Sequence, residues 1–335
     1  MQINEKYMRR ALQLAALGAG HASPNPMVGA VIVAPDGRII GEGWHRCCGE
    51  AHAEVNAVAS VADDAALRTA TMYVTLEPCS HWGRTPPCAQ LIIDKRIPRV
   101  VVGATDPFPA VSGRGIAMLR EAGVEVHTGL LAEESLRLNR RFITAHTQQR
   151  PYVVLKWAQS ADGFLDRMRQ PGQPAARIST PLTSVLMHRL RGRCDAILAG
   201  SGTVLADNPR LDARLWPGAK APRPVVLDRR GRVPADARMM REGAIVVREH
   251  TAPRGLLHML YAEHGITSLL VEGGAEVLRS FIDAGAWDIA RVEVAPLRFG
   301  AEGTAAAPAM PCEPQKAETI DGNTIYWYEN PTEQL

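Results

Sequence analysis

The chain has 335 residues, of which 46% are hydrophobic, and its 38 lysines and arginines against 35 aspartates and glutamates leave a net charge of +3. This composition is typical of a folded globular protein, and the length favours two domains over one. The near balance of charge argues against a nucleic-acid partner, which usually requires a clear cationic excess.

Neither a membrane anchor nor a disulfide framework is expected. No apolar stretch approaches the roughly 18–20 residues that a membrane helix needs, and the first residues lack the basic and apolar regions of a signal peptide. Six cysteines in a chain of this length are too few for a disulfide scaffold. We therefore expect a cytoplasmic protein that has no membrane partner.

The first half of the chain alternates helix and strand signals. Apolar residues recur at helical spacing over 8–16. Strands are predicted over 28–33, 39–43, 72–76, 100–103 and 124–126, with a turn at 35–37 between the first two. Helices are predicted over 53–62, over 88–95 and from 116 to Gly123. Residues 145–151 are polar and end in Arg150-Pro151, which predicts a linker between a domain of residues 1–146 and one of residues 150–335.

A second set of strands follows the predicted linker. They are expected over 152–155, 196–199, 224–227, 244–247, 268–271 and 291–294, with helices over 182–191 and 277–284. The 170s and residues 301–314 are rich in Ala, Pro and Gly and are predicted to be mobile loops. Both halves are therefore of the α/β class.

Four residues of the first half form a metal-type pattern. His52 lies two positions before Glu54, and Cys79 and Cys88 follow the predicted strand 72–76. Zn²⁺ favours imidazole and thiolate ligands, and a catalytic site has three protein ligands and an open position. Glu54, as a carboxylate that is not a ligand, can carry protons. His-x-Glu followed by Pro-Cys is the zinc-deaminase signature, although the second cysteine here lies nine positions after the first rather than three.

Other interpretations of this pattern stay open. A single histidine or cysteine is more often a packed core residue than a ligand. A structural zinc site usually has four protein ligands, and the nearby spare thiols are Cys47 and Cys48, for which loop packing is the simpler explanation. The predicted ligands lie at helix N-termini, where the helix dipole stabilises a thiolate.

The stretch between the two cysteines carries polar groups suited to a phosphate. It contains hydroxyls, His81 and Arg84, and such groups bind phosphate oxygens well, although a solvated loop has the same composition. Asn25 and His45 flank the predicted hairpin and could line the same pocket.

The second half has two glycine clusters at strand ends. Residues 199–203 follow one apolar run, and residues 271–276 join another to a helix. Glycines in this position let backbone amides approach a pyrophosphate, but ordinary tight turns have the same pattern. The chain lacks a Gly-x-Gly-x-x-Gly fingerprint, so a Rossmann site is not indicated. Lys156, Asp207 and Arg214 add polar groups nearby.

Several stretches together resemble the bifunctional riboflavin-biosynthesis deaminase/reductase family. They are residues 23–29 (SPNPMVG), 41–45 (GEGWH), 52–55 (HAEV) and 75–88, followed in the same order by 113–116 (GRGI), 138–142 (LNRRF) and 150–153 (RPYV). The resemblance implies an N-terminal cytidine-deaminase-like three-layer α/β/α domain and a C-terminal dihydrofolate-reductase-like α/β domain. It also implies a phosphorylated diaminopyrimidine substrate, zinc, NADPH and a homo-oligomer, a dimer.

The resemblance assigns roles to residues of this chain. In the first domain, His52, Cys79 and Cys88 bind zinc, Glu54 shuttles protons, and the predicted substrate contacts are Asn25, His45, His81 and Arg84. In the second domain, the predicted substrate contacts are Lys156, Arg191, Leu211, Arg214 and Glu272. The predicted NADPH contacts are Ala158, Thr203, Asp207, Gly274, Ala275 and Glu276, within the stretch from Gly274 to Ser280. Surface solvation is the alternative for Arg191 and Arg214.

The second domain departs from the family pattern. Where the family has Ser-x-Trp-Ile-Thr, this chain has residues 175–179 (AARIS), three positions further from Asp162-Gly163. The leading hypothesis is hydrolytic deamination followed by NADPH-dependent reduction. The alternatives are a deaminase whose second domain has lost turnover, a polynucleotide base deaminase, and a zinc-stabilised interaction module without catalysis.

Overall fold

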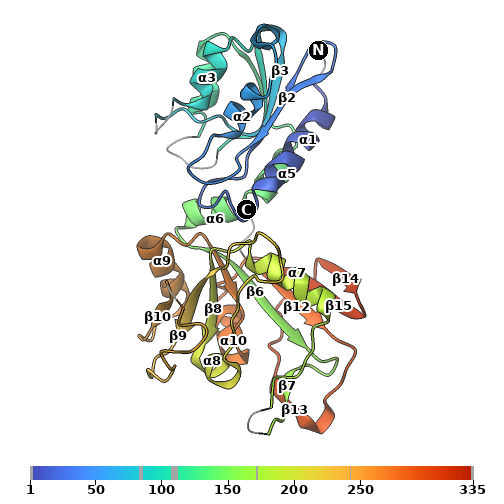
Figure 1. Cartoon of the computed structure of the whole chain (residues 1–335), viewed down its shortest axis with the longest axis vertical. Coiled ribbons are helices and arrows are strands. Elements are labelled where there is room, and N and C mark those ends of the chain that lie inside the picture. The colour runs from blue at the N-terminus through green and yellow to red at the C-terminus, as the bar shows by residue number, and fades with distance from the viewer. Residues whose placement is uncertain (1–2, 83–85, 107–111, 171–172, 242, 333–335) are drawn as a thin grey trace. The chain divides into compact units, whose positions relative to one another are not determined.

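The computed structural model describes residues 3–82, 86–106, 112–170, 173–241 and 243–332. The chain forms two compact units, residues 1–148 and 149–335, both of which are drawn in Figure 1. Within the described ranges, no helix combines the length and the apolar character needed to cross a membrane.

The first unit is built on one mixed sheet. Its strands lie in the order β2 (Ile39–Trp44), β1 (Gly29–Val33), β3 (Thr71–Leu76), β4 (Arg99–Ala104) and β5 (Glu125–Thr128). Strand β1 is antiparallel to both neighbours, whereas β3, β4 and β5 run parallel to one another. The carboxyl ends of β3 and β4 therefore meet at one edge of the sheet, which is where ligand sites form in α/β folds.

Helices cover both faces of this sheet. Side chains of α1 (Glu5–Ala15) pack on one face, together with Leu130 and Leu131, which precede α5 (Ala132–Leu138). The opposite face is covered by α2 (Ala53–Ala59), α3 (Cys88–Asp94) and α4 (Arg114–Glu121). The predicted three-layer α/β/α arrangement is confirmed. Helix α6 (Arg140–Gln148) ends the unit.

Glycines let two of these helices lie directly on the sheet. A methyl group on Gly29 would come within 2.0 Å of the carbonyl oxygen of Ala11 in α1. A methyl group on Gly43 would come within 2.5 Å of the carbonyl oxygen of Ala53 in α2. Only glycine fits such close contacts between backbones. The second contact holds the start of α2, with His52 and Glu54, against β2.

The second unit has a larger sheet. Its strand order is β10 (Ile245–Val247), β9 (Arg223–Leu227), β8 (Ala196–Gly200), β11 (Ser268–Val271), β6 (Tyr152–Gln159), β12 (Ile289–Val294), β15 (Asn323–Glu329) and β14 (Lys316–Ile320). The strands from β10 to β12 are parallel, and the last two are antiparallel. Strands β7 (Phe164–Arg167) and β13 (Gly303–Ala306) pair with each other in a separate ribbon.

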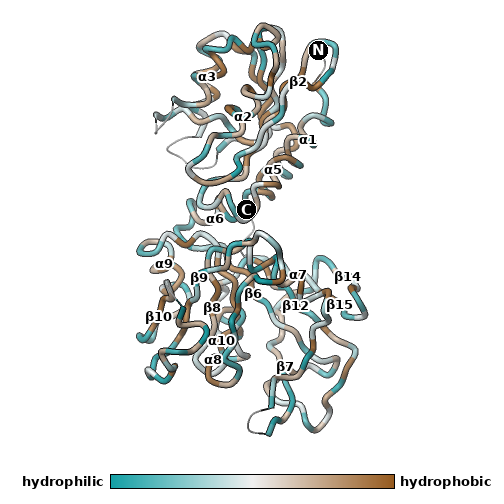
Figure 2. The backbone as a smooth tube through the Cα atoms, viewed as in Figure 1, coloured by the Kyte–Doolittle hydropathy of each residue, from teal (hydrophilic) through white to brown (hydrophobic). Residues whose placement is uncertain are grey.

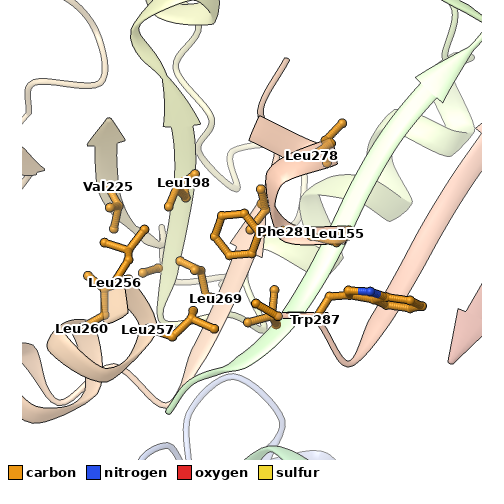
Figure 3. Packing of buried hydrophobic residues seen from close by; sticks show 14 of the residues in the cluster. Leu155, Leu198, Val225, Leu256, Leu257, Leu260, Leu269, Leu278, Phe281 and Trp287 are labelled. Carbon is orange, nitrogen blue, oxygen red and sulfur yellow. The ribbon is translucent and has the colours of Figure 1, made fainter. Parts of the chain in front are cut away.

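Apolar side chains fill both faces of this larger sheet. On one face, the strand residues Leu155, Leu198 and Leu269 pack against α9 (Pro253–His264) and α10 (Ala275–Asp283), with Phe281 and Trp287 almost fully buried (Figure 3). The other face packs against α7 (Pro181–Arg191) and α8 (Ser201–Asp207). Strands covered on both faces are hydrophobic throughout, as the brown colour of β8 shows (Figure 2).

The structure confirms most predicted elements and adds α5, α6, α8, α9, β7, β13, β14 and β15, which were not predicted. Residues 145–148, predicted as part of a linker, form the last turn of α6, because their helical hydrogen bonds continue to the unit boundary. Helix α2 ends at Ala59, three residues before the predicted end. Residues 303–306, predicted as loop, form strand β13. Helix α9 was missed, although Leu256, Leu257 and Leu260 give it a buried face.

Candidate functional site

Three predicted ligands converge in the first unit. The Nδ1 atom of His52 lies 3.3 Å from Sγ of Cys88 and 3.6 Å from Sγ of Cys79. The three donor atoms all lie within 4.8 Å of one another. In a tetrahedral zinc site, bonds of about 2.0–2.3 Å put neighbouring donors about 3.5–3.8 Å apart. The nature and the spacing of these donors therefore fit a zinc ion.

The ends of three elements hold these donors. Cys79 follows β3, Cys88 is the first residue of α3, and His52 is the N-cap residue of α2. The backbone N–H of Cys88 donates to Sγ of Cys79 at 3.2 Å, and the N–H of Ala89 donates to the carbonyl of Cys79 at 3.1 Å. The N-terminus of α3 thus offers positive charge to a thiolate.

The two sulfurs differ in acidity. A hydrogen bond from Cys88, with a second from His52, lowers the pKa of Cys79 to about 4. The same contact with Cys79, together with burial, raises the pKa of Cys88. The hydrogen bond with Cys79 also raises the pKa of His52. A sulfur that carries a proton must release it before it can become a zinc ligand.

Glu54 stands beside the donor set without belonging to it. Its side chain is 3% exposed. Burial, reinforced by the charge of Cys79, raises the pKa of Glu54 to about 7. A carboxyl group with a pKa near neutrality can both accept and release a proton, which is the property of a general acid–base group.

Asn25 and His45 lie next to this cluster. The carbonyl of Ala51 can only accept, so Nδ1 of His45 donates to it at 3.1 Å, and Nε2 then accepts from the side-chain amide of Asn25 at 3.2 Å. Burial lowers the pKa of His45, which keeps this ring neutral. The ring of His45 meets the ring of His52 edge to face, with centroids 5.5 Å apart.

The remaining predicted substrate contacts of this unit are His81 and Arg84. His81 is exposed, and Arg84 lies outside the described residues. Cys47 is half-buried and Cys48 is exposed, and neither belongs to the donor set found among the described residues. The structure therefore favours a centre with three protein ligands and gives no support to a fourth thiolate.

Sequence reasoning assigned no role to Asn139, which holds the segment of Asn25. Its Oδ1 accepts from the N–H of Met27 at 2.8 Å, and its Nδ2 donates to the carbonyl of Met27 at 2.9 Å. The two residues are 112 positions apart, so no local pattern could have revealed this pairing.

The second unit contains a cavity of about 1230 Å³ at the carboxyl ends of its parallel strands. It gathers the predicted cofactor contacts and two predicted substrate contacts, which are Lys156, Ala158, Thr203, Asp207, Glu272, Gly274, Ala275 and Glu276. Both glycine clusters lie in its wall, at the N-termini of α8 and α10. A cavity of this size can hold a dinucleotide in part or in full.

Two lining residues of this cavity, Lys156 and Glu272, form a buried ion cluster with Arg191. Arg191 donates to both carboxylate oxygens of Glu272 at 2.7 and 2.8 Å, and Nζ of Lys156 lies 3.9 Å from the same carboxylate. Burial alone would raise the pKa of Glu272, but the charges of Arg191 and Lys156 outweigh it and lower the pKa to about 2. Arg191 is therefore part of a buried network and not a solvated surface residue.

The other two predicted substrate contacts of this unit are Leu211 and Arg214. Neither belongs to the described residues that line the cavity. Leu211 is buried in the core, and the half-exposed Arg214 pairs with Asp212. A sequence pattern cannot distinguish an arginine that reaches a ligand from one that meets a neighbouring carboxylate.

Three arginines at the cavity were missed. Arg229, Arg230 and Arg232 follow β9 and line the cavity, and all three are exposed. The buried carboxylate of Asp228 shapes their loop, because it accepts from the N–H groups of Arg232 and Val233 at 3.0 and 2.9 Å. The run Asp-Arg-Arg-Gly-Arg directly after a predicted strand was the available signal.

The fold and the two sites define a protein that joins a deaminase-type zinc centre to a second unit with a cofactor cavity. Residues 1–104 match the family model of the cytidine and deoxycytidylate deaminase zinc-binding region, and residues 151–322 match that of the RibD C-terminal domain. The chain belongs to the RibD family, whose members are bifunctional deaminase/reductases of riboflavin biosynthesis. Its deaminase unit binds zinc, its reductase unit uses a nicotinamide cofactor, and the dihydrofolate-reductase-like fold predicted for the second unit is confirmed.

The relatives match over most of the chain. The riboflavin biosynthesis protein RibD of Aquifex aeolicus is 39% identical, covering 89% of this chain and 88% of its own length. That of Escherichia coli is 36% identical and covers 89% of each. Among solved structures, Acinetobacter baumannii RibD has a TM-score of 0.88 at 32% identity, covering 96% of this chain and 97% of its own. A diaminohydroxyphosphoribosylaminopyrimidine deaminase/5-amino-6-(5-phosphoribosylamino)uracil reductase from Thermotoga maritima has a TM-score of 0.86 at 36% identity, covering 97% and 98%.

Proposed function

We propose that residues 1–146 hydrolyse 2,5-diamino-6-(5-phosphoribosylamino)pyrimidin-4-one to 5-amino-6-(5-phosphoribosylamino)uracil, and that residues 150–335 reduce the ribosyl group with NADPH. The convergence of His52, Cys79 and Cys88 beside the buried Glu54 carries the first part of this proposal. The Thermotoga maritima relative has both activities in its name.

Glu54 is the proton carrier of the deamination. His52, Cys79 and Cys88 would hold a zinc ion, which would supply a Lewis acid that makes a water molecule more acidic. Glu54 accepts a proton from this water and delivers it to the 2-amino group. The water oxygen forms a bond to C2, the C2–N bond breaks, and ammonia leaves. The raised pKa of Glu54, about 7, suits both halves of this transfer.

Asn25 and His45 are proposed to orient the pyrimidine at this centre. The hydrogen bond between them uses Nε2 of His45 and one N–H of Asn25, so the amide oxygen and the second N–H of Asn25 are held in a fixed direction. His81 and Arg84 are proposed to contact the phosphate, on the family resemblance alone.

The second unit is proposed to bind the cofactor along the cavity wall and the sugar at the ion cluster. NADPH would supply a hydride that forms a C–H bond at C1′ while the C1′–O4′ bond of the ribose ring breaks; O4′ takes up a proton, and the open ribityl chain results. Ala158, Thr203, Asp207 and the stretch from Gly274 hold the cofactor. Lys156 and Glu272, with Arg191 behind them, hold the sugar end of the substrate. The role of Leu211 and Arg214 in substrate binding stays a prediction.

The three arginines after β9 support NADPH over NADH. The two cofactors differ by one phosphate on the adenosine ribose, and arginine is the usual partner of such a phosphate. Among the described residues, Arg229 and Arg230 have no acidic partner, and their loop is held by Asp228. Two uncompensated guanidinium groups at the rim of the cavity suit a dianionic group.

One experiment tests both activities. Zinc-loaded protein is given the diaminopyrimidine phosphate, and ammonia is measured before NADPH is added and its absorbance followed. We expect ammonia first and NADPH oxidation second. Ammonia without NADPH oxidation would favour the deaminase-only alternative, in which the departure at residues 175–179 has cost the second unit its turnover. No ammonia would contradict the proposal. The cytoplasmic location and the dimer stay predictions.

A further inference from the structure

A buried carboxylate lies two residues before the first cysteine ligand. Glu77 is 6% exposed and accepts four backbone hydrogen bonds. Its Oε1 accepts from the N–H groups of Gly115 and Ile116 at 2.8 and 3.3 Å, and its Oε2 accepts from those of Gly113 and Asp106 at 2.9 and 3.2 Å. All four lone-pair directions of the carboxylate therefore accept hydrogen bonds from backbone N–H groups.

These donors belong to the start of α4 and to the segment after β4. Gly113 is the N-cap residue of α4, so three of the four amides belong to its first turn, where the helix leaves N–H groups unsatisfied. Within the described part of the chain, Glu77 has no cationic partner. Backbone amides and the helix dipole alone compensate its buried charge. The carboxylate therefore joins the turn after β3 to α4.

Helix α4 also abuts the peptide next to the ligand. A methyl group on Gly115 would come within 1.9 Å of the carbonyl oxygen of Pro78, so the backbones of α4 and of the Pro78-Cys79 turn are in direct contact. On its other side, Cys79 is held by the N-terminus of α3, through the N–H groups of Cys88 and Ala89. The residue is confined between two helix ends.

We infer that Glu77 is a positioning residue, which sets Sγ of Cys79 at the distance that a metal ion requires by anchoring the Pro78-Cys79 turn to α4. Glu77 does not contact the metal. The inference rests on the proposed zinc centre and extends it, because the residues that orient ligands contribute to metal affinity as the ligands do. The four hydrogen bonds and the glycine contact are independent supports for it.

Glu77→Gln tests the inference. The amide group that replaces one carboxylate oxygen turns an N–H₂ toward two backbone N–H donors, so two hydrogen bonds are lost and the turn is released. We expect the Kd for zinc to rise about 10- to 100-fold, which is typical when a ligand-orienting contact is lost. We also expect the thiolate absorption of the Co²⁺-substituted full-length protein to shift, because the sulfur moves relative to the metal.

A core variant supplies the matched control. Leu119 lies in α4 and is fully buried. It is not one of the four residues whose N–H groups donate to Glu77. Leu119→Ala, or the milder Leu119→Val, is chosen so that its loss of stability in the zinc-free protein equals that of Glu77→Gln. The control should keep the wild-type Kd for zinc and the wild-type Co²⁺ spectrum.

Gly115→Ala supplies a second, independent variant. It keeps the carboxylate and the backbone N–H of residue 115, but its methyl group would come within 1.9 Å of the carbonyl oxygen of Pro78 and 3.3 Å of Oε1 of Glu77. The contact should displace the Pro78-Cys79 peptide from α4, so the variant should change the Co²⁺ spectrum in the same way. Unchanged affinity and spectrum in both variants would overturn the inference, as would failure of both to fold while the Leu119 variant folds. If the wild-type protein itself showed no thiolate–cobalt absorption, the proposed zinc centre would fail instead.

Discussion

The two sites of this protein are built in different ways. The zinc centre gathers its donors between positions 52 and 88, at the ends of neighbouring elements, and places them within 4.8 Å of one another. The cofactor cavity draws its wall from strands and loops between Lys156 and Ala305 and encloses about 1230 Å³. A compact centre depends on each atom, whereas an extended cavity divides binding among many contacts. Single substitutions should therefore have larger effects in the first unit.

The largest effect is expected for Cys88→Ser. Removal of a thiolate ligand should release zinc and abolish deamination, while reduction of the deaminated substrate continues, because the described residues that line the cavity belong to the second unit alone. Bound zinc and ammonia release measure the first effect, and NADPH oxidation measures the second. Cys48→Ser, at an exposed thiol outside the donor set, is the control and should retain both. Full zinc content in Cys88→Ser would refute the ligand assignment.

The next largest effect is expected for Glu54→Gln. The amide cannot carry a proton, so the rate of ammonia release should fall by about 10²–10⁴-fold. Zinc content should be unchanged, since Glu54 is not in the donor set. Glu50→Gln, at an exposed position nearby, should leave the rate as it is. A parallel loss of zinc and activity would show that Glu54 is a structural residue of the centre.

A substitution in the ion cluster tests whether the second unit relies on buried charge. Glu272→Gln leaves Arg191 and Lys156 buried without their carboxylate. We expect the free energy of unfolding of the second unit to fall by about 3–5 kcal/mol. Denaturant unfolding measures this change. Glu276→Gln, an exposed neighbour on α10, should change stability by about 0.5 kcal/mol or less. Equal effects of the two would mean that the cluster contributes no more than a surface charge.

The smallest effect is expected at the arginine loop. The double variant Arg229→Ala, Arg230→Ala should have a Kd for NADPH that is roughly 10- to 100-fold higher, because one or two charge-assisted hydrogen bonds are lost. Its Kd for NADH should be unchanged. Titration calorimetry with NADPH, NADH and 2′,5′-ADP measures this difference. Arg68→Ala, at an exposed arginine of the first unit, removes charge without touching the cavity. Equal loss for both cofactors would place the phosphate elsewhere.

Local patterns predicted the elements that bury continuous apolar runs. Strand β11 was predicted over the four residues that form it, and α7 to within one residue. Helix α9 was missed because its apolar residues are not concentrated on one face, so that only packing on the sheet selects the face that is buried. Strands β7 and β13 of the separate ribbon were missed because, among the described residues, they pair only with each other, and more than a hundred residues of sequence separate them.

The sequence by itself determined the chemistry of the zinc centre. His52, Glu54, Cys79 and Cys88 are specified by residue type and spacing, because the type of donor atom and the order of the residues are already enough to indicate a zinc centre. Only the tertiary structure decided that Arg191 is buried against Glu272 and that three arginines border the cavity. The physical reason is the range of the interactions, since a charge acquires its partner only when distant strands have formed one sheet.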